Sequence, residues 1–361
     1  MEILGPNFIP IVLNIALALS VLSLVLLLYI TVEHWMIDRR QQHNSTFGKA
    51  IIPLIWRFLR GEATEETAIK AMQEDPTEAL SLLIHLAHEL ESSSRPRLQP
   101  LFTGLIFIDE EIDALKSNQL KRRLLATERL GFLNNEASTA ALLDALEDKI
   151  PAIRLCAARS LAIQGKTEAI KPILQALDLP NELDNRREAE AISDYGPSAV
   201  PTLLTMLESP IGKYSANAII VAARVLGMLR TSEAVQPLIR LLKNPQESVR
   251  LCAARALGEI GDPAAISPVA ALANDPAWRV RKKAMKAIGK LHADRQIPML
   301  SNALSDSSWW VRFSAAQALH SLGQVGITEL QKVMKNTSDE HAREICCEVL
   351  EEHMILDTKK N

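Results

Sequence analysis

A nine-residue pattern recurs along this chain with a period of 31, and this period restricts the fold more than any single residue does. The copies Val249–Leu257 (VRLCAARAL), Val280–Ile288 (VRKKAMKAI) and Val311–Leu319 (VRFSAAQAL) follow one another at that spacing. A fixed period of this size is typical of a solenoid, in which each unit buries its apolar face only against its neighbours. We therefore expect a stacked array that presents a long surface for contact.

The period continues in both directions from these copies. Further copies are Arg122–Leu130, Ile153–Leu161, Ala218–Leu226 and Ala342–Leu350. A three-residue slip around Pro180–Asp184 is expected to place another copy at Arg187–Tyr195. The repeat array is thus expected to span residues 117–357.

Each unit is predicted to be a pair of helices. Val249, Ala253, Leu257 and Ile260 recur every three to four positions and form one apolar stripe. A turn follows at Gly261–Asp262–Pro263, and the second helix is expected over Ala264–Ala273. Since no run alternates with period two, we expect an all-α fold. The expected architecture is a right-handed α-solenoid of helix pairs.

The repeated phrase resembles the HEAT-repeat family, and especially its short bacterial form named after phycobilisome lyases. The shared pattern D-P-x-x-x-V-R-x-x-A-A-x-A-L-G-x-I-G is found at Asn244–Gly261, with Asn for Asp, and at Asp275–Gly289. The resemblance covers roughly Leu115 to Ile355. It implies the fold much more strongly than a function, because the family binds many unrelated partners.

In HEAT proteins an Asp/Arg pair forms a ladder along the stack, and the resemblance implies one here. Asp275 precedes Arg281 by six residues, and the same spacing recurs in two other units. We interpret these charges as structural rather than catalytic. The expected ladder residues are Asp148, Arg154, Arg250, Asp275, Arg281, Asp306 and Arg312.

A long apolar stretch near the start of the chain predicts a membrane anchor. Residues 3–32 contain no charged side chain, and at 1.5 Å per residue Ile9–Ile30 spans about 33 Å, enough for a hydrocarbon core of about 30 Å. We expect a transmembrane helix over 9–32 after a short segment, 1–8. The alternative is a cleaved signal peptide, but the basic leader and small-residue cleavage site typical of one are missing.

Basic residues predict the orientation of this anchor. Arg39 and Arg40 follow the span, whereas no Lys or Arg precedes it. The positive-inside rule then places the solenoid in the cytoplasm and the N-terminus outside, in a single-pass protein of the inner (cytoplasmic) membrane.

Two less regular regions separate the anchor from the array, namely 33–60 and 61–116. Residues 33–60 are apolar, basic and Trp-bearing, as in segments that lie in the membrane interface. The alternative for Phe47–Arg60 is a buried first helix of the domain. The candidate interface residues are Trp35, Arg39, Arg40, Trp56, Arg57 and Arg60.

Aromatic residues recur at the repeat period and mark a candidate partner site. Trp278 and Trp309 lie one period apart, and Trp310 follows directly. Trp and Arg are enriched at the energetic centres of interfaces. The alternative is that the rings cap grooves between repeats and the lysines are solvated. The remaining candidate residues of this site are Arg279, Lys282 and Lys283.

No catalytic constellation is found, so we expect neither an enzyme nor a cofactor. Cys156, Cys252, Cys346 and Cys347 lack the spacing of metal ligands and are interpreted as buried structural thiols. His85 and His88 share a helical face without a third ligand nearby, so no metal site is expected.

These features predict a membrane-anchored scaffold that binds a protein partner, as an accessory subunit of a membrane-associated enzyme or assembly. No small-molecule substrate is expected, and a net charge of −3 disfavours nucleic acid. Two alternatives remain open. The resemblance allows a chromophore lyase or isomerase subunit, and some HEAT-like solenoids bind nucleic acid.

Overall fold

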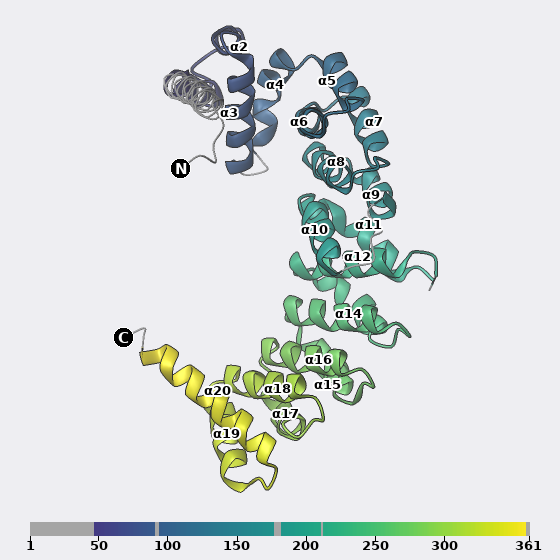
Figure 1. Cartoon of the computed structure of the whole chain (residues 1–361), viewed down its shortest axis with the longest axis vertical. Helices are drawn as coiled ribbons and strands as arrows, with labels where there is room; N and C mark the ends of the chain where they lie inside the picture. Colours follow the sequence, from purple (N-terminus) through teal and green to yellow (C-terminus); the bar gives the residue numbers. More distant parts are fainter. Residues whose placement is uncertain (1–46, 91–93, 177–181, 211, 359–361) are drawn as a thin grey trace, which may run out of the picture. The chain divides into compact units, whose positions relative to one another are not determined.

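The computed structural model describes residues 47–90, 94–176, 182–210 and 212–358, and these residues form helices and turns without a strand (Figure 1). They divide into two compact units, one ending at Phe107 and the other beginning at Ile108. No helix in the described part is both long enough and apolar enough to span a membrane. The span expected at 9–32 lies outside the described residues.

The first unit contains the helical residues 47–59 and a short group of further helices. Helix 47–59 buries Phe47, Ile51 and Ile55 at a spacing of four, so one of its faces belongs to the core of this unit. The other elements are α2 (Glu65–Met72), α3 (Pro76–Glu89), the 3-10 helix η1 (Arg95–Leu98) and α4 (Gln99–Leu105).

The second unit is a stack of helix pairs in two layers (Figure 1). The first helices of the pairs are α6 (Leu120–Gly131), α8 (Pro151–Gln164), α10 (Glu182–Ser193), α12 (Ala216–Met228), α14 (Glu247–Ile260), α16 (Trp278–Lys290), α18 (Trp309–Ser321) and α20 (Glu340–Thr358). The second layer consists of α5 (Ile108–Leu115), α7 (Glu136–Ala145), α9 (Ile170–Ala176), α11 (Val200–Glu208), α13 (Val235–Leu241), α15 (Ile266–Ala270), α17 (Ile297–Ala303) and α19 (Gln324–Asn336). Helix α5 packs against α6, so this unit begins at Ile108, ahead of the boundary at 117 that the repeat pattern suggested.

Small residues let neighbouring first helices approach closely. A Cβ atom added to Gly258 would lie 2.9 Å from both Cα and Cβ of Ala287 on the next first helix. Gly227 and Gly289 meet Ala256 and Ala318 in the same way. Such contact leaves no room for a larger side chain, because protein interiors are close-packed. Beside these contacts the fully buried Leu257, Ile288 and Leu319 fill the core.

Most second helices are preceded by a 3-10 turn, and proline explains why. Pro268 has no N–H group, so the carbonyl of Ala264, four residues earlier, cannot receive an α-helical hydrogen bond from it. The chain there forms the 3-10 helix η5 (Pro263–Ala265), and α15 is followed by η6 (Ala271–Asn274). The corresponding turns are η2 (Thr167–Ala169), η3 (Gly196–Ala199), η4 (Ser232–Ala234) and η7 (Asp294–Gln296).

Backbone angles correct one repeat in the predicted register. Residues with positive φ follow the first helices at Gly165, Gly196, Arg230, Gly261, His292 and Gly323. Successive members of this series lie one period apart, except that the step from Gly196 to Arg230 is three residues longer. Buried Ala189 and Ile192 likewise lie one period after buried Ala158 and Leu161.

The expected copy at Arg187–Tyr195 was therefore wrong by three residues, and the pattern occupies 184–192. The extra residues come after α10 rather than before it. The slip was misplaced because Glu188, which is buried, occupies a position that holds Ala157 and Ala253 in other units.

Candidate functional site

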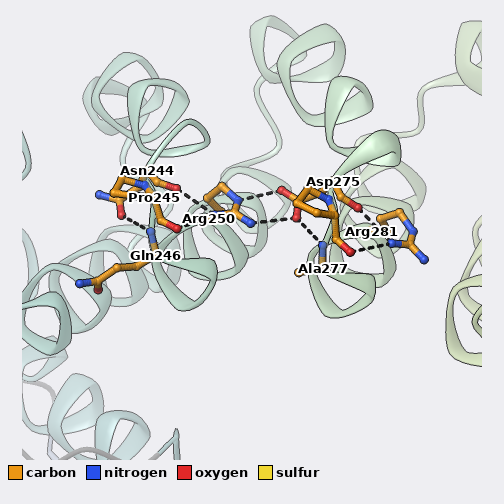
Figure 2. Close-up of polar contacts among 8 residues, drawn as sticks. Asn244, Pro245, Gln246, Arg250, Asp275, Ala277 and Arg281 are labelled. Atoms are coloured by element: carbon orange, nitrogen blue, oxygen red, sulfur yellow. Dashed lines mark hydrogen bonds and ion pairs between the residues drawn. The ribbon is translucent and has the colours of Figure 1, made fainter.

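A ladder of charged hydrogen bonds runs between successive units (Figure 2). The Arg250 guanidinium donates to both carboxylate oxygens of Asp275, from Nε at 2.7 Å and from Nη2 at 2.9 Å. Its Nη1 donates to the main-chain carbonyl of Asn244 at 2.9 Å. Asp275 also accepts a hydrogen bond from the backbone N–H of Ala277 at 2.9 Å. One arginine therefore joins the start of its own first helix to the next unit.

The same geometry corrects the predicted pairing of Arg281. Its carboxylate partner is Asp306, with Nε and Nη2 distances of 2.7 and 2.8 Å, whereas it contacts only the main-chain carbonyl of Asp275, at 3.0 Å. The short spacing of six residues thus gives a side-chain to main-chain bond, and the ion pair forms with the aspartate of the next unit. Bidentate pairs of this kind bring directional specificity as well as charge attraction.

The remaining expected ladder residues follow the same rule with gaps. Asp148 pairs with Arg123, a residue that the expected set did not contain, and Arg154 donates to the Asp148 carbonyl at 2.9 Å. Arg312 donates to the Asp306 carbonyl at 2.9 Å. A search for Arg followed by Asp at the spacing of Arg250 and Asp275, rather than for Asp followed by Arg at six, would have found Arg123.

The ladder changes the protonation of its carboxyl groups. Burial alone would raise the pKa of Asp275, but the hydrogen bonds from Arg250 and the Ala277 N–H outweigh it and hold that pKa below its usual value. The pKa of Asp306 is likewise lowered, with burial opposed by Arg281 and the Ser308 N–H. Both groups are therefore ionised at neutral pH and serve the stack rather than proton transfer.

The tryptophans on α18 form a small aromatic cluster with an exposed edge. Trp309 and Trp310 meet edge to face with ring centroids 4.8 Å apart, and Phe313 stacks on Trp309 at 5.0 Å. Trp310 is 50% exposed and Trp309 is 39% exposed, so these rings are not enclosed between helices. Trp278 on α16 is half-buried, and the Arg279 guanidinium lies 5.0 Å from its ring centroid.

The lysines of α16 lie beside this cluster in two different environments. Lys282 Nζ is 4.5 Å from the centroid of the Trp310 ring, a cation–π contact between neighbouring units. Burial, and then the nearby Lys286, lower the pKa of Lys282. Lys283 is half-buried, and burial is also the first cause of its lowered pKa, followed by repulsion from Arg255.

Sequence reasoning missed Phe313 as part of this cluster. Phe313 occupies the repeat position of Lys282 and lies four residues after Trp309, which places both rings on one helical face. That i, i+4 spacing was the signal that could have identified it.

Only part of the expected membrane-interface set can be located. Trp56, Arg57 and Arg60 are exposed on or just after helix 47–59, and Arg60 pairs with Glu62 at 2.8 Å. Exposed Ile52 shares the face of Trp56. The helix therefore has both a buried face and an exposed one, so the two alternatives drawn from the sequence each describe one side of it. Trp35, Arg39 and Arg40 lie outside the described residues.

The cysteines and histidines offer no reactive centre in the described part of the chain. Cys252 is buried, its Sγ donates to the Ile220 carbonyl at 3.2 Å, and burial raises its pKa to about 11. Cys346 is also buried, whereas Cys156 and Cys347 are partly exposed. A thiol with a raised pKa is a poor nucleophile at neutral pH.

His85 pairs with Glu89 at 3.2 Å on one helix. Across the described residues, no group of three or more His, Cys, Asp or Glu side chains is placed to hold a metal ion.

The repeat geometry agrees with a comparison with known families. Residues 108–193, 200–282 and 267–351 match the family model of HEAT repeats, and together they cover more than half of the chain. The chain belongs to the HEAT-repeat family. This confirms the resemblance seen in the repeated phrase, and the all-helical solenoid that it implied.

Solved HEAT and armadillo structures resemble this chain at low sequence identity. The complex of CpcE and CpcF of phycocyanin lyase from Nostoc sp. PCC7120 is 18% identical, covering 68% of this chain and 94% of that one, with a TM-score of 0.33. YibA of E. coli is 19% identical, covering 67% and 96%, with a TM-score of 0.37. A structure of importin beta is 14% identical, covering 81% and 47%, with a TM-score of 0.44.

These likenesses concern the fold and carry no argument about function. None of the curated proteins compared with this chain matches it in sequence.

Proposed function

We propose that this chain is a membrane-anchored scaffold whose HEAT array docks a protein partner. The observation that carries the proposal is the exposed aromatic cluster of Trp309, Trp310 and Phe313 on a repeat array, beside Lys282. Exposed aromatic rings bordered by cations are common at protein interfaces, where they bury a large area with few rotamers. The array provides a rigid support for such a surface.

The membrane part of the proposal is supported by the sequence of residues 9–32 and the arginines that follow it. Such a helix would hold the array at the cytoplasmic side of the inner membrane, with the N-terminus outside. Confinement to a membrane raises the effective concentration of the scaffold near partners on the same surface. An accessory subunit of a membrane-associated enzyme or assembly is the role that fits these features.

The docking surface is tested by removing its two exposed rings. We expect a Trp309→Ala, Trp310→Ala variant to lose its partner in a pull-down from native membranes, while its melting temperature stays close to that of the parent chain. The matched control is Val325→Ala, which truncates a 58% exposed apolar side chain on α19. A double variant that keeps its partner but melts several degrees lower would mean that the rings only stabilise the stack.

A further inference from the structure

Helix α16 carries more cations than its surroundings neutralise. It contains six Lys and Arg residues, and neither α16 nor α18 contains Asp or Glu. Arg281 is paired with Asp306 in the ladder, and Arg279 and Lys290 reach carboxylates on α14 at 3.9 and 4.0 Å. Lys282, Lys283 and Lys286 have no carboxylate within ion-pair distance among the described residues. Three positive charges on this helix are therefore uncompensated.

Two of these cations lie next to the open side of the aromatic cluster. Lys282 lies over the Trp310 ring, and Lys286 is exposed one helical turn further along α16. Mutual repulsion between Lys282 and Lys286 contributes to the lowered pKa of Lys282. An incoming anion would relieve this repulsion, and half of the Trp310 surface remains open for an apolar group.

We infer that this aromatic–basic surface, defined as Trp309, Trp310, Phe313, Lys282 and Lys286, binds an acidic segment of a protein partner. Carboxylates of the segment would face the two lysines, and an apolar side chain would pack on Trp310. The inference rests on the proposed docking function and adds the chemistry of the partner.

A protein segment fits this surface better than a nucleic acid does. Glu247 and Glu259 on α14 lie within 4.0 Å of the outer cations of α16, so carboxylates border the basic patch. A phosphate backbone carries negative charge in a continuous line and would meet these carboxylates, whereas a short acidic segment can end before them. The net charge of −3 opposes a polyanion further.

The test uses the full-length chain in its native membranes. Benzoylphenylalanine is placed at position 310, the sample is illuminated, and the cross-linked product is identified by mass spectrometry. The control carries the same photoprobe at position 325 on α19. We expect position 310, but not position 325, to capture a protein segment in which Asp and Glu outnumber Lys and Arg.

Charge exchange then tests whether that contact is electrostatic. A Lys282→Glu, Lys286→Glu variant should bind the captured partner at least about tenfold more weakly, because attraction becomes repulsion. Lysines placed at the acidic positions of the captured segment should restore binding to this variant. A melting curve like that of the parent chain shows that the array is intact, as expected for substitutions of partly exposed side chains.

The other outcomes separate this inference from the proposed function. Capture of a neutral or basic protein segment, or unchanged affinity after charge reversal, overturns the acidic-segment inference and leaves protein docking in place. Capture of RNA, DNA or lipid at position 310, or no product there, overturns both.

Discussion

One residue at the end of each first helix shows how local geometry is repeated through the array. Gly261 has φ 83°, and its equivalent one unit later is His292, with φ 48°. A side chain with a Cβ atom pays about 1–2 kcal/mol to adopt this left-handed conformation. His292 is exposed, and a Cβ at Gly261 would meet nothing within 4 Å, so conformational strain is the main difference between the two positions.

This comparison gives a prediction at the residue scale. Gly261→Ala should lower the free energy of unfolding by about 1 kcal/mol, because alanine is strained at positive φ. His292→Gly should leave it unchanged or raise it by up to about 1 kcal/mol, since relief of strain is partly offset by a more flexible unfolded chain. Urea unfolding measures both. Equal destabilisation by the two substitutions would contradict this account of the turn.

At the scale of elements, the ladder ties α14, α16 and α18 together through ion pairs between neighbouring units. The side chains of Arg281 and Asp306 are only 15% and 13% exposed, so solvent weakens their attraction much less than in a surface pair. Arg281→Ala should lower the free energy of unfolding by about 1–3 kcal/mol, because Asp306 and two main-chain carbonyls lose their donor. Thermal melts measure this loss.

Arg279→Ala is the matched control for that substitution. Its side chain is 61% exposed and its pair with Glu247 is 3.9 Å long, so the expected change is within about 0.5 kcal/mol. Equal effects of the two alanines would mean that the ladder adds no more stability than a surface pair.

The lowered pKa values of Asp275 and Asp306 predict how the ladder depends on pH. A carboxyl group whose pKa is lower in the folded state stabilises the fold fully above its unfolded pKa, about 3.9. That contribution is lost as pH falls from about 4 through the folded pKa. An Asp275→Asn variant should therefore lose less stability than the parent chain when urea unfolding is repeated at pH 7 and near pH 2. Parallel pH profiles for the two chains would exclude this contribution.

At the scale of the whole molecule, the ladder has gaps within the second unit. Arg250 and Asp275 correspond, one unit earlier, to Ile219 and Asn244, so both partners of that pair are replaced together. This arrangement avoids a half-buried charge without its counterion, which would be costly. After α18, Thr337 takes the place of the aspartate that would receive Arg312.

Restoring the gap tests whether the ladder is modular. An Ile219→Arg, Asn244→Asp double variant should be more stable than the sum of the two single changes predicts, by about 1 kcal/mol or more of coupling energy. Each single variant should lose stability or stay level, because it introduces one charge without a partner. Additive effects in the double-mutant cycle would show that the α12–α14 junction cannot accommodate the pair.

The proposed anchor gives a second prediction at this scale. A reporter fused after Asn361 should be active only in the cytoplasm, because the arginines follow the apolar stretch 9–32. A chain starting near Thr46 should be mostly released from membranes. Reporter activity outside the cytoplasm would reverse the orientation. Full retention of the shortened chain would assign membrane binding to helix 47–59 itself.

The sequence by itself determined the helix pairs, their regular period and the HEAT fold, because apolar spacing and turn residues act over a few neighbouring positions. It also located the arginines and aspartates of the ladder and the tryptophans on α16 and α18. It placed one unit three residues too late, because buried Glu188 breaks the apolar pattern on which the alignment relied.

Only the tertiary structure decided which of these residues meet. Arg281 was expected to pair with Asp275, six residues away, but the stagger between stacked units brings it to Asp306. The exposure of Trp310 and its contact with Lys282 likewise depend on how α18 packs against α16. Spacing along a chain describes one helix at a time, whereas contacts across a stack depend on the separation and offset between helices.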